Sequence, residues 1–475
     1  MKVLYVASEG APYSASGGLG DVIGALPKAV ARADKDTECS VILPLYGNMK
    51  AEHRAQLQHV TDITFKLSWR TTGASIYKIT ANNVDYYFVE NHYYFDRAKT
   101  YGEWDDGERF SFFSMAVVEF MLKCDLIPDV LHANDWQTAL TVIYLKTKYK
   151  KEEKLSGIRT LFTIHNIEFQ GKYDLAILGD VFALDNSFRD IVEHAGCINL
   201  LKGAVTVSDY VSTVSPNYAC ELRHDFFAFG LAGVMNSISD KMTGIINGID
   251  YSAFSPKGGE DIYKAFDKRT LKSGKKANKL ALQAELGLDV NPDIPLISMV
   301  TRLTDQKGLD LVLHIMKELL NENVQVALLG TGDEKYEDAF EAISNEYSNF
   351  KALIKFDRAL SKKLYASADI FLMPSKSEPC GLAQMIACAY GTVPVVRAVG
   401  GLYDSIKPYG TDDSNGFTFN NYNAHELLFT LKDALKLYDD KEEWAKLTKR
   451  AINTDFSWDN SAIKYIELYN SLKNW

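Results

Sequence analysis

Short apolar runs alternate with segments of helical period along most of the chain. The first run covers residues 3–7, and the apolar residues that follow it recur at the spacing of one helical face: Leu19, Val22, Ile23, Leu26 and Val30. Pro27 lies inside this predicted helix and is expected to kink it. The pattern therefore predicts a strand, a glycine-containing loop and a helix at the start of the chain.

The second half of the chain starts again with the same pattern. A strand is predicted at 296–300, followed by a loop at 301–307 and a helix whose apolar side holds Leu309, Val312, Leu313, Met316, Leu319 and Leu320. Further strands are predicted at 324–329, 352–356, 370–373 and 393–396. Strands that alternate with helices favour a parallel α/β architecture, and we place the hinge between the halves near residue 245. Two Rossmann-like halves imply a ligand in a cleft that faces the carboxyl ends of the strands.

The glycine-containing loop, "SASGGLGDV" at 14–22, raises a question about its ligand. Gly17 and Gly18 let the backbone approach another group closely, and the following helix points its positive end toward the same place. The loop has no lysine or arginine, however, and loops that bind phosphates usually carry one. It is either a phosphate-binding turn without its cation or a tight turn.

Composition narrows the class of protein. The 475 residues suggest two or three domains, and the net charge of −10 argues against nucleic acid or an anionic membrane as the main partner. The six cysteines are scattered without a C-x-x-C pair, which is typical of reduced thiols. The start is too quickly polar for a signal peptide, and no apolar run is long enough for a transmembrane helix. We expect a cytoplasmic protein, with a plastid form without its transit peptide as the alternative.

Arg302 and Lys307 lie five positions apart in the loop after the strand at 296–300. Two fixed cations at a strand's carboxyl end can neutralise a diphosphate leaving group, which is otherwise done by a metal ion. The alternative is a pair of solvated charges at the start of a helix.

A second polar segment follows the strand at 370–373. Pro379 suits the first turn of a helix, so the N–H groups of Cys380, Gly381 and Leu382 would form a site for an anion or a hydroxyl group. Glu378 would accept hydrogen bonds from a sugar, or alternatively only stabilise the helix dipole.

Two histidines come near the ends of apolar runs. His165 directly follows the strand predicted at 161–164. The apolar run at 129–131 is followed in the same way by a segment that begins with His132 and contains Asp135. A lone histidine is more often structural than catalytic, but its position at a strand's carboxyl end shifts the balance toward function. We reject a metal site, because no further ligand has a suitable spacing. P-loop, H-E-x-x-H and G-x-S-x-G motifs are also missing, which excludes three large enzyme classes.

Taken together, these segments resemble the family of bacterial glycogen synthases and plant starch synthases, which are two-domain GT-B glycosyltransferases. The resemblance covers nearly the whole chain, through "KVLYVASEGAPYS", "SGGLGDVIGALPKAV", "PDVLHANDWQTAL", "LFTIHNIEFQGKY", "VSTVSPNYACEL", "IINGIDYSAFSP", "VTRLTDQKGLDLV", "SEPCGLAQ", "VRAVGGLYDSI" and "DFSWDNSA". It implies an N-terminal Rossmann-like domain at 1–244 on the acceptor side, completed by the helix 459–475, which crosses back to it. It also implies a C-terminal, nucleotide-sugar-binding domain at 245–458.

By this resemblance, the enzyme transfers glucose from ADP-glucose to the non-reducing end of an α-1,4-glucan, with retention of configuration and without a metal or other cofactor. The matching catalytic positions are Arg302, Lys307, Glu378, His165 and Asp135. The matching positions on the donor are Ala15, Ser16, Gly17, Gly18, Asp21, Asn247, Phe356, Cys380, Gly381 and Leu382. Asn247 matches the interdomain acceptor side, and Phe356 an aromatic residue near the base.

Two positions depart from the wider pattern. Many retaining GT-B enzymes have a glutamate at the position of Ile386, but the synthases lack it and have the glutamine found here as Gln384. The family's loop typically begins with a lysine where this chain has Ala15, and that lysine is associated with the phosphates of ADP-glucose. Two alternatives follow: the same reaction with UDP-glucose as donor, or a catalytically weak glucan-binding or regulatory protein.

Overall fold

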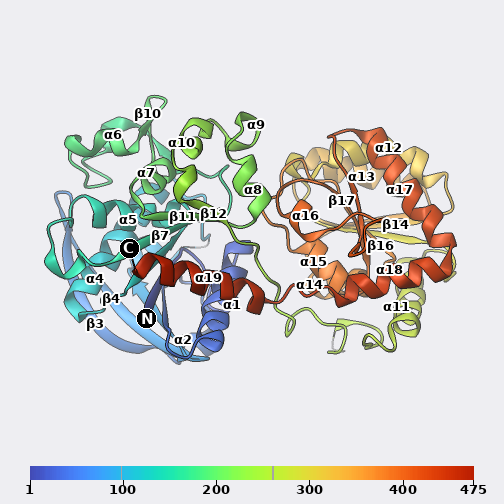
Figure 1. Ribbon diagram of the computed structural model, residues 1–475, viewed down its shortest axis with the longest axis horizontal. Coiled ribbons are helices and arrows are strands. Elements are labelled where there is room, and N and C mark those ends of the chain that lie inside the picture. The colour runs from blue at the N-terminus through green and yellow to red at the C-terminus, as the bar shows by residue number, and fades with distance from the viewer. Residues whose placement is uncertain (98, 259–260, 475) are drawn as a thin grey trace. The chain divides into compact units, whose positions relative to one another are not determined.

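The computed structural model describes residues 1–97, 99–258 and 261–474, and it divides into two compact units (Figure 1). Unit 1 comprises Met1–Gly248 with Trp458–Trp475, and unit 2 comprises Ile249–Ser457. From the sequence we expected the two boundaries at 244/245 and 458/459. Each unit contains a parallel sheet with helices, which confirms the predicted α/β class.

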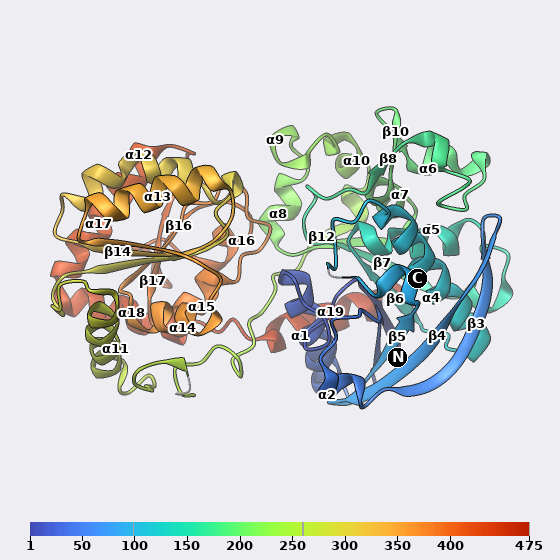
Figure 2. The same ribbon diagram turned by 180° about the vertical axis from the view of Figure 1, so that it is seen from behind.

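Unit 1 is built on a nine-stranded sheet in the order β12-β11-β7-β6-β1-β2-β5-β4-β3. Its strands are β1 (Lys2–Val6), β2 (Glu38–Pro44), β3 (Gln58–Leu67), β4 (Arg70–Ala81), β5 (Val84–Glu90), β6 (Val130–Asn134), β7 (Arg159–Ile164), β11 (Tyr210–Thr213) and β12 (Met242–Gly244). All pairings from β12 to β5 are parallel, whereas β3 and β4 form an antiparallel hairpin that extends the sheet. Figure 2 shows this long hairpin at the edge of the unit.

The other elements of unit 1 are helices and one small sheet. The helices are α1 (Gly18–Ala33), α2 (Ala51–Arg54), α3 (His92–Phe95), α4 (Asp106–Cys124), α5 (Ala139–Lys146), α6 (Arg189–Val192), α7 (Leu200–Val207), α8 (Pro216–Glu221), α9 (Asp225–Ala228), α10 (Ala232–Ser237) and α19 (Trp458–Lys473). The small sheet contains β8 (Lys172–Tyr173), β9 (Glu193–His194) and β10 (Cys197–Asn199).

Unit 2 is built on a six-stranded, fully parallel sheet in the order β15-β14-β13-β16-β17-β18. Its strands are β13 (Leu296–Val300), β14 (Gln325–Gly330), β15 (Phe350–Ile354), β16 (Ile370–Met373), β17 (Val393–Arg397) and β18 (Phe417–Phe419). Its helices are α11 (Leu271–Leu286), α12 (Leu309–Leu320), α13 (Glu334–Glu346), α14 (Arg358–Ser367), α15 (Ala383–Ala389), α16 (Gly400–Ser405), α17 (Ala424–Asp439) and α18 (Lys441–Asn453). Figures 1 and 2 show α12 and α13 on one face of this sheet and α14 and α15 on the other.

The C-terminal helix α19 belongs to the core of unit 1, as predicted. Trp458, Tyr465 and Tyr469 are buried in the same apolar cluster as the inner face of α1 and strand β1. Full burial of an aromatic side chain contributes about 2–3 kcal/mol, so these three residues anchor the helix strongly. Figure 1 shows the red α19 beside the blue α1. Pro27, which we expected to kink α1, lies inside that helix.

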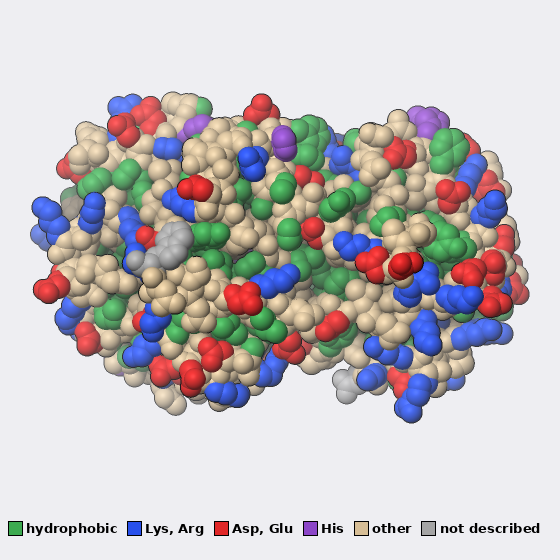
Figure 3. Space-filling model, viewed as in Figure 1, with side chains coloured by type: hydrophobic (Ala, Val, Ile, Leu, Met, Phe, Trp, Pro, Cys, Tyr) green, Lys and Arg blue, Asp and Glu red, His purple; other side chains and the backbone are tan. Residues whose placement is uncertain are grey.

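Two predicted elements differ from the structure. The strand expected at 352–356 is β15, Phe350–Ile354, because its register on β14 starts two residues earlier and ends at Ile354. The helix expected to begin with Pro379 begins at Ala383, so the segment before it is a loop. No helix among the described residues is long and apolar enough to cross a membrane. On the face shown in Figure 3, acidic and basic side chains are interspersed.

Candidate active site

The carboxyl ends of three neighbouring strands in unit 1 bring a cluster of polar residues together. Glu9 follows β1, Asp135 follows β6 and His165 follows β7, and these strands are adjacent in the sheet. Ligands of open parallel sheets bind at this edge, outside the carboxyl ends of the strands. The cluster is therefore the candidate site of unit 1.

The Asp135 carboxylate is held in a fixed position. Its backbone has a φ of 57°, in a region that costs a non-glycine residue about 1–3 kcal/mol. Its Oδ1 accepts the His165 N–H at 2.7 Å, which ties the end of β6 to the end of β7. Burial raises the pKa of Asp135 to about 7, although backbone hydrogen bonds from His165 and Asn166 lower it. Near neutral pH, this carboxyl group is thus divided between its two protonation states.

The His165 imidazole is neutral, because burial lowers its pKa to about 3. Its Nε2 lies 2.9 Å from the Asn134 Oδ1, while the Asn134 amide nitrogen donates to two backbone carbonyls. That arrangement requires Nε2 to carry the proton, so Nδ1 is the acceptor. His165 can therefore accept a hydrogen bond from a hydroxyl group but cannot act as a cation.

His132 has a structural role instead, which corrects our expectation that strand β6 ends before it. The strand continues to Asn134, and His132 is fully buried within it. Its Nδ1 lies 2.8 Å from the Tyr469 hydroxyl and its Nε2 lies 2.6 Å from the Thr163 hydroxyl. Burial lowers the pKa of His132 to about 3. Its neutral ring links the sheet to the C-terminal helix.

The glycine-containing loop wraps around a residue that sequence reasoning missed. The Glu9 carboxylate accepts hydrogen bonds from the Ser16 hydroxyl at 2.7 Å, from the Ser16 N–H and from the Gly20 N–H at 3.3 Å. Burial raises the pKa of Glu9, against the effect of these bonds. The backbone N–H groups of Ser16 and Gly20 are thus already bonded within the protein. The position of Glu9 shortly after β1 was the signal that could have identified this residue from the sequence.

The remaining loop positions are open to solvent. Ala15, Ser16, Gly17, Gly18 and Asp21 are all exposed. A Cβ atom at Gly18 would meet nothing within 4 Å, so contacts within the described residues do not require a glycine there. The space that this glycine leaves is available to a ligand.

Unit 2 brings a second group together at the carboxyl ends of its neighbouring strands β13 and β16. Lys307 Nζ lies 2.7 Å from Glu378 Oε2, and their side chains are only 13% and 9% exposed. The Ser375 hydroxyl donates to the same Oε2 at 3.0 Å. The Arg302 side chain, in contrast, is exposed and makes no hydrogen bond or ion pair with any residue in the described ranges. Of the two predicted cations, Lys307 is therefore paired with a carboxylate, whereas Arg302 is available to a ligand.

Two glycines allow the loops of this group to approach each other. Gly308 has a φ of +69°, and a Cβ there would lie 2.1 Å from the Pro374 carbonyl oxygen. Gly400 has a φ of +46°, and a Cβ there would lie 1.9 Å from the Glu378 carbonyl oxygen. Any side chain at these positions would push the loops apart.

The segment with Cys380, Gly381 and Leu382 is a loop held by the following helix, not the first helical turn that we predicted. The Gln384 side chain donates to the Cys380 carbonyl at 3.1 Å and to the Gly381 carbonyl at 2.9 Å. Gly381 has a φ of +71°, which the predicted helix would not allow. Gln384 is a second residue whose role sequence reasoning missed.

The last two predicted positions differ in exposure. Asn247 is buried in unit 1, and its Oδ1 has no hydrogen-bond partner within the described part of the chain. Phe356 follows β15 in unit 2 and is 90% exposed. A buried oxygen without a partner is costly, and an exposed ring offers a stacking surface, so both positions suit a ligand.

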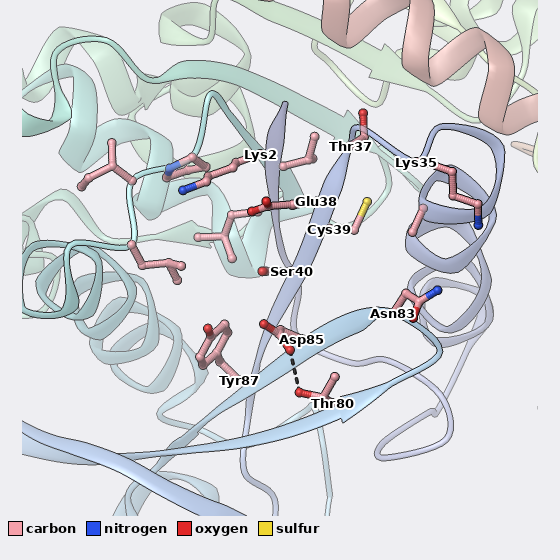
Figure 4. A pocket seen from close by; sticks show the side chains of 16 residues that line it. Lys2, Lys35, Thr37, Glu38, Cys39, Ser40, Thr80, Asn83, Asp85 and Tyr87 are labelled. Carbon is pink, nitrogen blue, oxygen red and sulfur yellow. Dashed lines mark hydrogen bonds between the residues drawn. The ribbon is translucent and has the colours of Figure 1, made fainter.

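One cavity lies at the opposite edge of the unit 1 sheet. It has a volume of 410 Å³ and includes Lys2, Glu38 and Asp85, which stand at the amino ends of β1, β2 and β5 (Figure 4). This edge is not where parallel sheets bind ligands, so we do not assign the cavity to the active site. In the ranges that the structure describes, no group of three or more His, Cys, Asp or Glu could hold a metal ion.

Two family models and several known proteins match this chain. Residues 2–237 match the starch synthase catalytic domain, and residues 287–453 match the glycosyl transferases group 1. The glycogen synthase of Alkaliphilus metalliredigens is 43% identical over 99% of this chain and 100% of its own length. The glycogen synthase of Streptococcus sanguinis is 44% identical with the same coverage.

Two solved structures are similar to this chain over nearly its full length. The catalytic domain of starch synthase IV from Arabidopsis thaliana, bound to ADP and acarbose, covers 100% of this chain and 99% of its own, with a TM-score of 0.90 and 34% identity. Sucrose-phosphate synthase from Thermosynechococcus elongatus covers 99% of this chain and 98% of its own, with a TM-score of 0.62 and 16% identity, which indicates the shared fold alone.

The fold and these matches define a glycosyltransferase of the GT-B class. Within that class, the chain belongs to the family of glycogen and starch synthases. Membership in this family implies a nucleotide-sugar donor and a glucan acceptor.

Proposed function

We propose that this protein is a glycogen or starch synthase that transfers glucose from ADP-glucose to the non-reducing end of an α-1,4-glucan, with retention of configuration. The observation that carries the proposal is the Lys307–Glu378 pair at the carboxyl ends of β13 and β16, with the exposed Arg302 in the same loop as Lys307. The solved starch synthase with ADP and acarbose bound supports ADP-glucose as the donor.

In this proposal, Arg302 and Lys307 stabilise the departing diphosphate. Negative charge develops on the diphosphate as the glycosidic bond breaks and the sugar becomes oxocarbenium-like. Arg302 has no competing carboxylate among the described residues, so its full charge is available. Lys307 is already partly neutralised by Glu378 and therefore contributes less charge. No metal ion is needed for this step.

Glu378, His165 and Asp135 would bind the glucose. Lys307 and Ser375 both contact Oε2 of Glu378, which leaves Oε1 to accept a hydrogen bond from a sugar hydroxyl. The neutral His165 offers Nδ1 as an acceptor, and Asp135 can donate or accept because its pKa is about 7. Fixed polar groups of this kind orient the sugar for transfer.

The leaving diphosphate would accept the proton of the attacking acceptor hydroxyl. This front-face substitution retains configuration without a covalent enzyme intermediate. Water must be excluded during the step, because it would otherwise hydrolyse the donor.

The other predicted positions complete the proposed donor and acceptor sites. Phe356 would stack on the nucleotide base. On the acceptor side, the Oδ1 of Asn247 would accept a hydrogen bond from the glucan. The exposed loop would face the phosphates through Ala15, Ser16, Gly17, Gly18 and Asp21, and the second loop through Cys380, Gly381 and Leu382. We assign acceptor binding to unit 1 and nucleotide-sugar binding to unit 2.

UDP-glucose as donor is the second candidate, because Ala15 removes a cation that the family places at the donor phosphates. Incorporation of labelled glucose into glycogen, measured in parallel with the two nucleotide sugars, tests both. A higher kcat/KM for UDP-glucose would overturn ADP-glucose as the donor. Incorporation of glucose from neither nucleotide sugar would leave a glucan-binding or regulatory protein. NMR of the glycosidic linkage in the product tests retention of configuration.

A further inference from the structure

Helix α11 begins in a strongly basic part of the chain. Residues 264–276 include six Lys or Arg and one acidic residue, although the whole chain has a net charge of −10. Lys268, Lys272 and Lys276 are exposed, and their side chains make no hydrogen bond or ion pair with any residue that the structure describes. These three lysines, here called the basic stripe, recur every four residues, so Lys272 and Lys276 share one face of α11.

The local structure of α11 does not favour this charge. Lys272 stands in the first turn, where the positive end of the helix dipole repels a cation. Lys272 and Lys276 also repel each other, because residues four apart are neighbours on a helix surface. Arg269, in contrast, is paired with Asp267 at 3.1 Å. In Figure 3, Lys and Arg side chains gather in the part of unit 2 where Figure 1 labels α11. A single exposed lysine is usually only hydrated, but the basic stripe concentrates charge at the expense of its helix.

Helix α13 carries the opposite charge. Glu334, Asp338 and Glu341 are exposed, and their spacing of four and three residues places them on one face of the helix. Their side chains likewise have no hydrogen bond or ion pair within the described ranges. The helix dipole favours Glu334 in the first turn, but its effect has faded at Asp338 and Glu341. These three residues, here called the acidic stripe, therefore repel one another.

The two helices lie on opposite faces of the unit 2 sheet. Leu282 of α11 packs in one apolar cluster with Leu360 and Leu364 of α14. Tyr336 and Phe340 of α13 belong to the other cluster, together with the buried residues of α12. Figures 1 and 2 both show α13 and α11 separated by the sheet. The two stripes of one copy therefore cannot pair with each other, whereas a second copy can present its acidic stripe to the basic stripe of the first.

We propose that the basic stripe of one copy of this chain binds the acidic stripe of a second copy. Charge complementarity carries the inference, because each stripe offers three unpaired charges of one sign. Four residues rise about 6 Å along a helix, so the distance from Lys272 to Lys276 matches the distance from Glu334 to Asp338. A contact between two different surfaces is head to tail, and it extends to a ring or an open row of copies. This inference goes beyond the proposed function and does not depend on it.

The contact should be weak and should depend on salt. Exposed ion pairs contribute little individually and are screened by salt, although opposite potentials speed the encounter of two copies. The basic stripe also leaves the proposed active site accessible. Lys275, which lies between two of its lysines, is 3.3 Å from the Tyr390 carbonyl oxygen and 2.6 Å from the Thr392 hydroxyl, directly before β17. This part of α11 thus lies at the amino ends of the strands, away from Lys307 and Glu378.

Sedimentation velocity over a range of protein concentrations measures the association. It is run in about 0.01 M salt, where charges interact over about 30 Å, and in about 1 M salt, where the range is about 3 Å. The basic-reversed variant is Lys268→Glu/Lys272→Glu/Lys276→Glu, and the acidic-reversed variant is Glu334→Lys/Asp338→Lys/Glu341→Lys. The matched control, Lys35→Glu/Lys150→Glu/Lys151→Glu, makes the same change of net charge at exposed lysines of unit 1.

Mixing the two reversed variants gives the sharpest test. Each variant alone has like charges on both stripes, so neither should associate with itself. An equimolar mixture again offers opposite charges and should associate. Three reversals shift the net charge of −10 by six units, so both variants remain negative and net charge does not attract them. Thermal unfolding checks that each variant is folded.

We expect the wild-type protein to associate in low salt and to sediment as a monomer in high salt. In low salt, the association constant of each reversed variant should fall at least about tenfold, while the control stays within about twofold of wild type. The mixture should recover most of the loss. A wild-type protein that stays monomeric in low salt, an association that the reversals leave unchanged, or a mixture that does not recover would overturn the proposal.

Two further outcomes separate this inference from others. If glucose is incorporated from neither nucleotide sugar, the proposed function fails, but the sedimentation of the mixture still decides the contact between copies. If the wild-type protein stays monomeric and instead binds a labelled single-stranded oligonucleotide, and the basic-reversed variant loses this binding, the basic stripe serves a polyanion and the proposal is wrong.

Discussion

Replacing Asp135 by asparagine should make unit 1 more stable at alkaline pH, although it removes a proposed sugar-binding group. Burial raises the pKa of Asp135 from 3.8 to about 7. Between these values the unfolded chain is ionised while the folded protein retains its proton. The free energy of unfolding therefore falls as pH rises from about 4 to about 7. Asparagine keeps the side-chain oxygen that accepts the His165 N–H but carries no charge, so the variant should lack this loss.

The magnitude follows from the pKa. Each pKa unit is worth about 1.4 kcal/mol, so the full effect at pH 8 is about 4 kcal/mol. Asp135 is half-buried, and solvent screening should reduce this to roughly 2 kcal/mol. For a unit of this size, 1 kcal/mol corresponds to about 2–4 °C in Tm, which gives an expected gain of about 4–8 °C.

Differential scanning calorimetry at pH 4 and pH 8 measures this effect, because it can resolve separate transitions for the two units. The gain of Asp135→Asn over wild type should be present at pH 8 and small at pH 4. Asp209→Asn is the matched control with the opposite sign. Asp209 is also desolvated, but the Lys146 ion pair and hydrogen bonds from Thr160 outweigh burial and lower its pKa. That variant should lose stability at pH 8 and lose less at low pH. An Asp135→Asn variant that is equally destabilised at both pH values would refute the reasoning.

Three other substitutions test the donor site. Arg302→Ala should lower kcat by about 10²–10³, the loss seen when one fixed hydrogen-bond donor to a developing charge is removed. The Tm of the variant should stay unchanged, because the Arg302 side chain is exposed. A loss of less than tenfold in steady-state kinetics would contradict the role of Arg302. Ala15→Lys should lower KM for the nucleotide sugar, and unaltered kinetic constants would place the loop away from the phosphates. Phe356→Ala should raise KM for the nucleotide sugar about tenfold through lost stacking, with kcat little changed; an equal fall in kcat would argue against a base contact.

Much of the fold could be predicted because its signals are local. The strand at 296–300 and the helix that starts at Leu309 have the predicted bounds, since each is an apolar pattern between clear turn residues. The errors lie where local preference competes with tertiary contacts. Pro379 suits a helix start, but Gln384 and the close approach of Gly400 hold the segment as a loop. His132 resembles His165 in its sequence context, yet lies inside a strand because β6 continues to Asn134, three residues beyond the apolar run at 129–131.

The sequence by itself determined the alternation of strands and helices, the family, and the residue types that stand at the carboxyl ends of the strands. These properties depend on neighbours in the chain. Only the tertiary structure decided how those residues are charged and partnered. Glu9 binds the loop that was expected to bind phosphate, Lys307 is paired with Glu378 while Arg302 is not, and Asp135 keeps its proton to about pH 7. The physical reason is that burial and pairing depend on residues far apart in sequence, which local patterns do not record.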